Sequence, residues 1–205
     1  MVVSAGMNRP LNILLSNDDG VHAPGILAMR RSLAAAGHTV TVCAPDRPRS
    51  ATGHSITLHK PLRLKEVALH DGSPAFACSG MPADCVLMGV TQLMLGNRFD
   101  CVVSGINHGP NLGWDTTYSG TVAAAIEGVM FGVPGIAFSQ VDRGWAQIED
   151  AAKAARDIVT QALQEPMERG DGIATLLNVN IPNGHYEQLK RWRVTRLGTR
   201  HHSQP

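Results

Sequence analysis

What the sequence lacks excludes several classes of protein. No apolar run approaches the roughly 18 residues of a membrane-spanning helix. The stretch 1–6 is too short for the apolar region of a secretory signal, and we expect residues 1–10 to form a tail. Charge of one sign is not in excess, with 18 Lys and Arg against 17 Asp and Glu. A surface that attracts nucleic-acid duplexes or anionic membranes is therefore not expected. These absences predict a soluble, cytoplasmic protein.

Cysteine is scarce, and its spacing is that of neither a zinc site nor a disulfide framework. No CxxC pair occurs, and each cysteine lies among apolar residues, which predicts buried free thiols. The four are Cys43, Cys78, Cys85 and Cys101. Also missing are the G-x-G-x-x-G fingerprint, the Walker P-loop, the G-x-S-x-G elbow and H-E-x-x-H. These gaps disfavour a dinucleotide site, a P-loop NTPase, an α/β-hydrolase and a zinc protease.

The pattern that is present predicts one α/β domain over residues 11–198, followed by a polar tail, 199–205. Apolar and β-branched runs predict strands, and apolar stripes at helical spacing predict helices. The strands are predicted at 11–15, 39–43, 100–104, 135–139 and 174–181, and the helices at 26–36, 82–95, 121–131 and 148–163. A weakly alternating stretch, 55–78, predicts a β-hairpin excursion. This alternation predicts an open, mostly parallel sheet with helices on both faces.

Three polar loops, 17–25, 45–54 and 105–121, follow predicted strands. In such a sheet, ligands bind outside the carboxyl ends of the strands. The first loop contains Asp18 and Asp19, whose charges repel each other unless a hard divalent cation lies between them. The alternative is a helix cap and turn, because Asp-Gly is a common turn pair.

The other two loops favour the metal site. Asn107 offers a neutral amide oxygen, and the middle loop offers hydroxyls and two arginines for a phosphate. Ser119, Gly120 and Thr121 open a helix whose free N–H groups and hydroxyls suit a phosphate. Ser119 taken alone is an ordinary N-cap. Because these ligands are oxygens, Mg²⁺ or Mn²⁺ fits better than Zn²⁺.

Two histidines are candidates for the proton donor to a leaving oxygen, His54 and His108, and the sequence does not choose between them. The role of His22 is open. Five more are predicted at the surface, in strands or in the tail: His38, His59, His70, His201 and His202.

Several blocks of this sequence resemble the SurE family of nucleotidases. They occur in the family's order over residues 11–140, which is far more specific than one motif. The blocks are residues 13–20, 44–47 with 49–57, 80–86, 104–107, 109–111 and 119–122.

The resemblance implies a Rossmann-like domain that hydrolyses nucleoside 5′-monophosphates, and also 3′-monophosphates, as a 5′-nucleotidase with one divalent metal ion per subunit. It implies metal ligands and catalytic groups among the loop residues, and phosphate contacts at the start of the helix that follows. The metal ligands would be Asp18, Asp19, Ser50 and Asn107, the first two also catalytic, and the phosphate contacts Ser119, Gly120, Thr121 and Asn111. It further implies a homodimer or homotetramer with exchanged C-terminal segments.

Two other functions stay open beside this one. The family continues for some tens of residues beyond the stretch 194–198, so a truncated, weakly active or non-catalytic nucleotide- or metal-binding protein is an alternative. An aspartyl-phosphate mechanism would use a second aspartate two residues after the nucleophile, and Val21 at that position counts against it. A purely structural protein is disfavoured by the number of ligand-type residues in the three loops.

Overall fold

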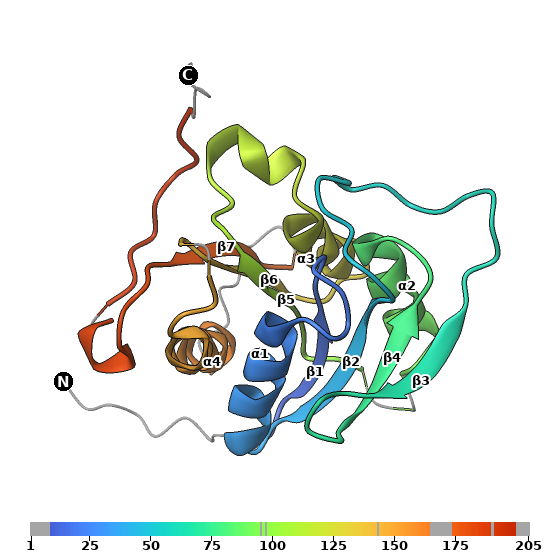
Figure 1. Ribbon diagram of the computed structural model, residues 1–205, viewed down its shortest axis with the longest axis horizontal. Helices are drawn as coiled ribbons and strands as arrows, with labels where there is room; N and C mark the ends of the chain where they lie inside the picture. The colour runs from blue at the N-terminus through green and yellow to red at the C-terminus, as the bar shows by residue number, and fades with distance from the viewer. Residues whose placement is uncertain are drawn as a thin grey trace.

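A seven-stranded sheet forms the centre of the computed structural model (Figure 1). The structure describes residues 9–94, 96, 98–142, 144–164, 174–189 and 191–199. Most of the two predicted tails, with His201 and His202, lies outside these residues. The strands are β1 (Asn12–Ser16), β2 (Thr39–Pro45), β3 (Leu64–Ala68), β4 (Pro74–Cys78), β5 (Cys101–His108), β6 (Gly135–Gln140) and β7 (Leu176–Ile181), in the spatial order β3-β4-β2-β1-β5-β6-β7.

Every strand pair is parallel except the hairpin of β3 and β4. In the part of the chain that the structure describes, four helices cover the two faces: α1 (Pro24–Ala35), α2 (Pro82–Gln92), α3 (Gly120–Met130) and α4 (Ile148–Gln164). Helices α1 and α4 pack together, and α2 packs with α3 (Figure 1). The predicted Rossmann-like α/β fold, with its hairpin excursion, is confirmed.

Strand β1 has an apolar run without polar alternation because both faces of the sheet are buried at this strand. Ile13 and Leu15 lie in the cluster shared with α1 and α4, whereas Leu14 lies in the cluster shared with α2. A strand buried on both faces needs no polar alternation. The apolar stripe of α4 packs against the first cluster, and its central residues, which include Ala152 and Val159, are fully buried.

Some boundaries differ from the prediction. Strand β5 continues to His108, four residues beyond the predicted end, because Asn107 and His108 still pair with β6 after a shift in register. The loop that follows contains a short 3-10 helix, η1 (Gly113–Thr117). Pro24 begins α1 two residues earlier than predicted; proline suits that position because its missing N–H is not needed there.

The histidine and cysteine predictions have different outcomes. All four cysteines are buried free thiols, as predicted. His59 and His70 are exposed, as predicted. His38, expected at the surface or in a strand, is only 7% exposed and precedes β2, because its Nδ1 accepts a hydrogen bond from the N–H of Leu11. None of the helices in the described part of the chain has the length and apolarity that crossing a bilayer requires.

Candidate metal centre

The two predicted metal-binding aspartates lie in a tight turn at the carboxyl end of β1. The buried Asn17 closes this turn: its side chain accepts a hydrogen bond from the N–H of Gly20 (3.1 Å) and donates one to the Gly20 carbonyl (2.9 Å). Gly20 has a φ of +98°, which a side chain would strain. The turn takes Asp18 and Asp19 out of the strand's alternation.

Asp18 is buried against the start of α3. Its side chain accepts a hydrogen bond from the Thr121 hydroxyl, and a Cβ at Gly120 would lie 2.8 Å from the Asp18 Cβ. Burial raises the pKa of Asp18, and hydrogen bonds from the Thr121 side chain and from the backbone of residues 120 and 121 oppose this rise. The positive end of the helix dipole thus faces a carboxylate that has little solvent around it.

Asp19 lies on the other side of the turn, half-buried. Its Oδ2 accepts a hydrogen bond from the backbone N–H of His108 at 3.3 Å. Burial first, and the charge of Asp18 second, raise the pKa of Asp19 to about 6. A divalent cation would offset the burial and the repulsion that raise these two pKa values, so the carboxylate pair suits a cation site.

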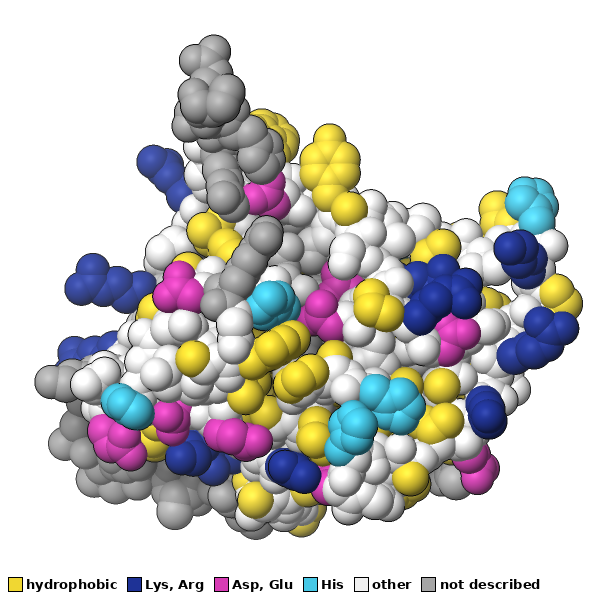
Figure 2. All heavy atoms as spheres, viewed as in Figure 1, with side chains coloured by type: hydrophobic (Ala, Val, Ile, Leu, Met, Phe, Trp, Pro, Cys, Tyr) yellow, Lys and Arg dark blue, Asp and Glu magenta, His cyan; other side chains and the backbone are white. Residues whose placement is uncertain are grey.

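The second and third loops meet the first at this turn. The N–H of Arg49 donates to the Asp18 carbonyl (2.7 Å), which brings Ser50 to the end of β1. Asn107 lies at the end of β5, next to the residue that binds Asp19. Its Nδ2 donates to the Gly109 carbonyl (2.8 Å), and no described residue occupies its Oδ1. Figure 2 shows acidic side chains beside a histidine near the middle of this face of the molecule.

These residues fit a hard divalent cation. Two carboxylates, one amide oxygen and one hydroxyl are the oxygen ligands that Mg²⁺ and Mn²⁺ prefer. Among the residues that the structure describes, no group of three or more His, Cys, Asp and Glu could hold a metal. A site at this turn therefore depends on Asn107 and Ser50 in addition to the two aspartates.

Most of the predicted phosphate-binding side chains already have partners within the protein. The Ser119 hydroxyl accepts from the Val122 N–H at 3.1 Å, so Ser119 is the N-cap of α3. The Thr121 hydroxyl is bound to Asp18. The Asn111 side chain donates to the Ser139 hydroxyl (2.8 Å), and its backbone is tied to β7. Their phosphate-binding roles stay predictions.

Both candidate proton donors are held by groups that the sequence reading missed. His54 Nε2 lies 2.6 Å from Oε2 of Glu127, a carboxylate on α3 only 7% exposed. His108 Nε2 accepts a hydrogen bond from the Gly144 N–H (2.6 Å), and its ring stacks on Trp145 with centroids 4.6 Å apart. Glu127 could have been noticed as the one acidic residue in a helix of small apolar residues. No such signal marks residues 144 and 145.

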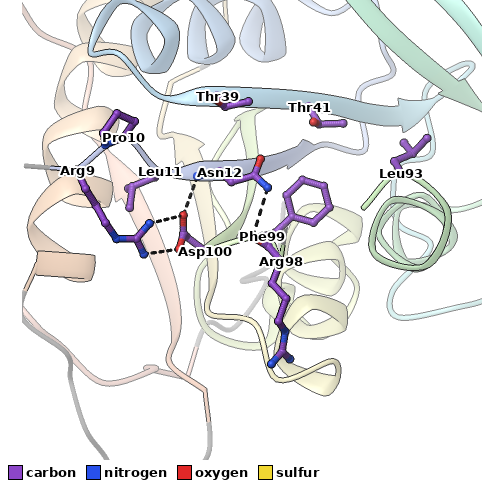
Figure 3. A pocket seen from close by; sticks show the side chains of 10 residues that line it. All are labelled: Arg9, Pro10, Leu11, Asn12, Thr39, Thr41, Leu93, Arg98, Phe99 and Asp100. Carbon is purple, nitrogen blue, oxygen red and sulfur yellow. Dashed lines mark hydrogen bonds and ion pairs between the residues drawn. The ribbon is translucent and has the colours of Figure 1, made fainter. Parts of the chain in front are cut away.

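A separate pocket of about 620 Å³ lies at the opposite end of the sheet (Figure 3). The amino ends of β1 and β2 line it with Asn12, Thr39 and Thr41. Arg9 at its rim is paired with Asp100, whose Oδ2 also accepts the Asn12 N–H. None of the predicted metal or phosphate ligands lines this pocket.

Comparison with known proteins agrees with the fold. The family model described as survival protein SurE matches residues 13–204. The crystal structure of SurE protein from Aquifex aeolicus is similar, with a TM-score of 0.81 and 45% sequence identity over 92% of this chain and 73% of that chain. The chain therefore belongs to the SurE family.

Proposed function

We propose that this chain is a divalent-metal-dependent phosphatase that hydrolyses nucleoside 5′-monophosphates, and also 3′-monophosphates, to nucleoside and phosphate. The SurE family is one of metal-dependent nucleotidases. The observation that carries the proposal is the pair Asp18 and Asp19, both with raised pKa values, where three loops meet. Such a pair is costly to bury unless a cation balances it.

In this proposal Asp18, Asp19, Ser50 and Asn107 hold one Mg²⁺ or Mn²⁺ ion per subunit. The free Oδ1 of Asn107 and the raised pKa values of the aspartates support this ligand set. When bound, the ion balances charge on the phosphoryl oxygens and makes a bound water more acidic.

The residues at the start of α3 would bind the phosphate. The N–H groups of Gly120 and Thr121 lie at a helix N-terminus, where anions bind favourably. They already interact with Asp18, so a phosphate would share them with this carboxylate. The Ser119 hydroxyl lies beside them, and the Thr121 hydroxyl holds Asp18 in place. We include Asn111 in the phosphate-binding set, since its bond to Ser139 fixes the loop in front of the helix.

Of the two histidines, we assign His108 as the proton donor to the leaving oxygen. The backbone N–H of His108 donates to Asp19, so this residue lies next to the proposed metal ligands. Its Nε2 accepts the Gly144 N–H, so the neutral ring carries its proton on Nδ1. To act as the acid, the ring would first take up a second proton on Nε2, which breaks the Gly144 contact, and would then donate one proton and return to the neutral form. His54 is instead held by Glu127, on α3.

The direct test is phosphate release from a panel of nucleoside monophosphates, with Mg²⁺ or Mn²⁺ and with a chelator. We expect activity that disappears on chelation, returns with metal, and falls by roughly 100-fold or more in Asp19→Asn and Asn107→Ala. His59→Ala, at an exposed histidine, is the matched control and keeps its activity. Activity that survives both chelation and Asp19→Asn would contradict the proposal.

A separate measurement addresses the non-catalytic alternative. Calorimetry that shows nucleoside monophosphate binding, with no phosphate released from any substrate and metal, would favour a binding protein. We also propose a homodimer or homotetramer in the cytoplasm. Light scattering coupled to size-exclusion chromatography tests the assembly, and a monomer would contradict it.

A further inference from the structure

Two exposed histidines from distant parts of the sequence lie side by side on one face. His22 belongs to the loop between β1 and α1, and His70 to the turn between β3 and β4. Their ring centroids are 5.7 Å apart, with the planes tilted by 55°. Figure 2 shows two adjacent histidine side chains in this region, near α1 and the hairpin. No described residue makes a hydrogen bond or ion pair with either ring, so their nitrogens are free to bind a ligand.

This spacing is close to that of two imidazoles on one metal ion. An imidazole nitrogen binds Zn²⁺ at about 2.0–2.1 Å, so two rings on a tetrahedral ion have centroids about 5 Å apart. The observed separation exceeds this value by less than about 1 Å. Because both side chains are exposed, a small rotation about their χ angles closes the gap without disturbing the core.

We propose that His22 and His70 bind one transition-metal ion of the type Zn²⁺, Ni²⁺ or Cu²⁺, with water completing its coordination. Imidazole suits these ions, whereas Mg²⁺ and Mn²⁺ prefer oxygen. The site is therefore chemically distinct from the aspartate centre, although His22 follows Asp19 by only three residues. It stands independently of the proposed phosphatase activity.

Asp71 and two arginines are the charged groups beside the pair. Asp71, next to His70, is held by the side chains of Ser73, Arg31 and Arg30, and the Ser73 hydrogen bond in particular keeps its pKa well below the ordinary range. It is thus ionised and offsets part of the charge of the two arginines. Since these groups already occupy Asp71, the histidines are the only protein ligands in the proposal, and the described residues offer no group of three.

The ion would join the loop that carries the two aspartates to the β3–β4 turn. Anything that binds only the folded chain stabilises it by mass action. Zn²⁺ should therefore raise the melting temperature, and this rise should require both histidines.

The test is a Zn²⁺ titration of the full chain with Mg²⁺ in excess, followed by NMR of the histidine side chains. We expect the His22 and His70 ring signals to shift together. In His22→Ala the Zn²⁺ response of His70 should disappear or need on the order of tenfold or more Zn²⁺, because one of two protein ligands is lost. His70→Ala should do the same to His22.

His59→Ala serves as the control, because His59 is exposed and stacks on no other histidine in the described structure. It should leave both Zn²⁺ responses unchanged, and far-ultraviolet circular dichroism checks that all variants fold. The proposal is overturned if the His70 signal responds to Zn²⁺ equally in the parent and in His22→Ala, or if neither signal moves. Loss of phosphatase activity plays no part in this readout.

Discussion

The negative charge of Asp19 destabilises the folded chain because the side chain is partly buried and lies near Asp18. Replacement of Asp19 by asparagine removes this charge. The pKa of Asp19 rises from 3.8 to about 6, first through burial and then through the charge of Asp18. The folded chain therefore binds this proton more tightly than the unfolded chain does. Stability falls as the pH rises through the window from 3.8 to about 6, and the full cost remains above it. Asparagine carries no charge, yet its oxygen can still accept the His108 N–H.

The size of the effect follows from the pKa. One pKa unit corresponds to about 1.4 kcal/mol, so the rise amounts to at most about 3 kcal/mol at neutral pH. Relaxation and partial solvation of the side chain reduce this value. We expect Asp19→Asn to be more stable than the wild type by about 1–3 kcal/mol at pH 7.5 without metal. The sign is diagnostic, because most substitutions destabilise by about 1 kcal/mol.

Urea unfolding with a chelator at pH 7.5 and again near pH 4 measures this difference. The gap between variant and wild type should shrink at the lower pH, where the wild-type carboxylate is protonated in the folded chain. Adding Mg²⁺ should stabilise the wild type and leave Asp19→Asn nearly unchanged. A variant less stable than the wild type at pH 7.5, or a gap independent of pH, would refute the reasoning.

Three further predictions concern packing and the proposed site's surroundings. In Gly25→Ala, the new methyl would lie 2.1 Å from the Ile106 carbonyl oxygen, so α1 must shift from β5; we expect about 1–3 kcal/mol of destabilisation in thermal melts. Glu127→Gln removes the charged partner of His54 Nε2 and should cost about 1.5–3 kcal/mol, measured by urea unfolding. Ile13→Ala empties a fully buried site in β1 and should cost about 2–5 kcal/mol with the urea m-value unchanged. An effect below 0.5 kcal/mol in any of the three would contradict the contact on which it rests.

The elements that the sequence predicted well are those whose pattern is set by local burial. Ile13, Leu14 and Leu15 are apolar on both sides, as a central parallel strand requires. The stripe of α4 is apolar on one side only, as a helix on a sheet requires. For these elements, the spacing of apolar residues in the sequence matches the positions that are buried in the structure.

The boundaries that differed depend on pairing with distant residues. Strand β5 continues through Asn107 and His108 because β6 is there to pair with it, although the sequence in this region is rich in glycine and asparagine. Likewise, His38 is buried because the N–H of Leu11, far away in the chain, donates to it. Local sequence propensity does not predict such contacts between residues that are far apart in the chain.

The order of residue types along the chain was enough to predict the fold class and the loops that carry oxygen-bearing side chains. How those loops meet depends on tertiary contacts: Thr121 with Asp18, His108 with Asp19, and Glu127 with His54. It also brought His22 and His70 together. These contacts join segments far apart in sequence, so their distances, burial and pKa values depend on packing that no local pattern encodes.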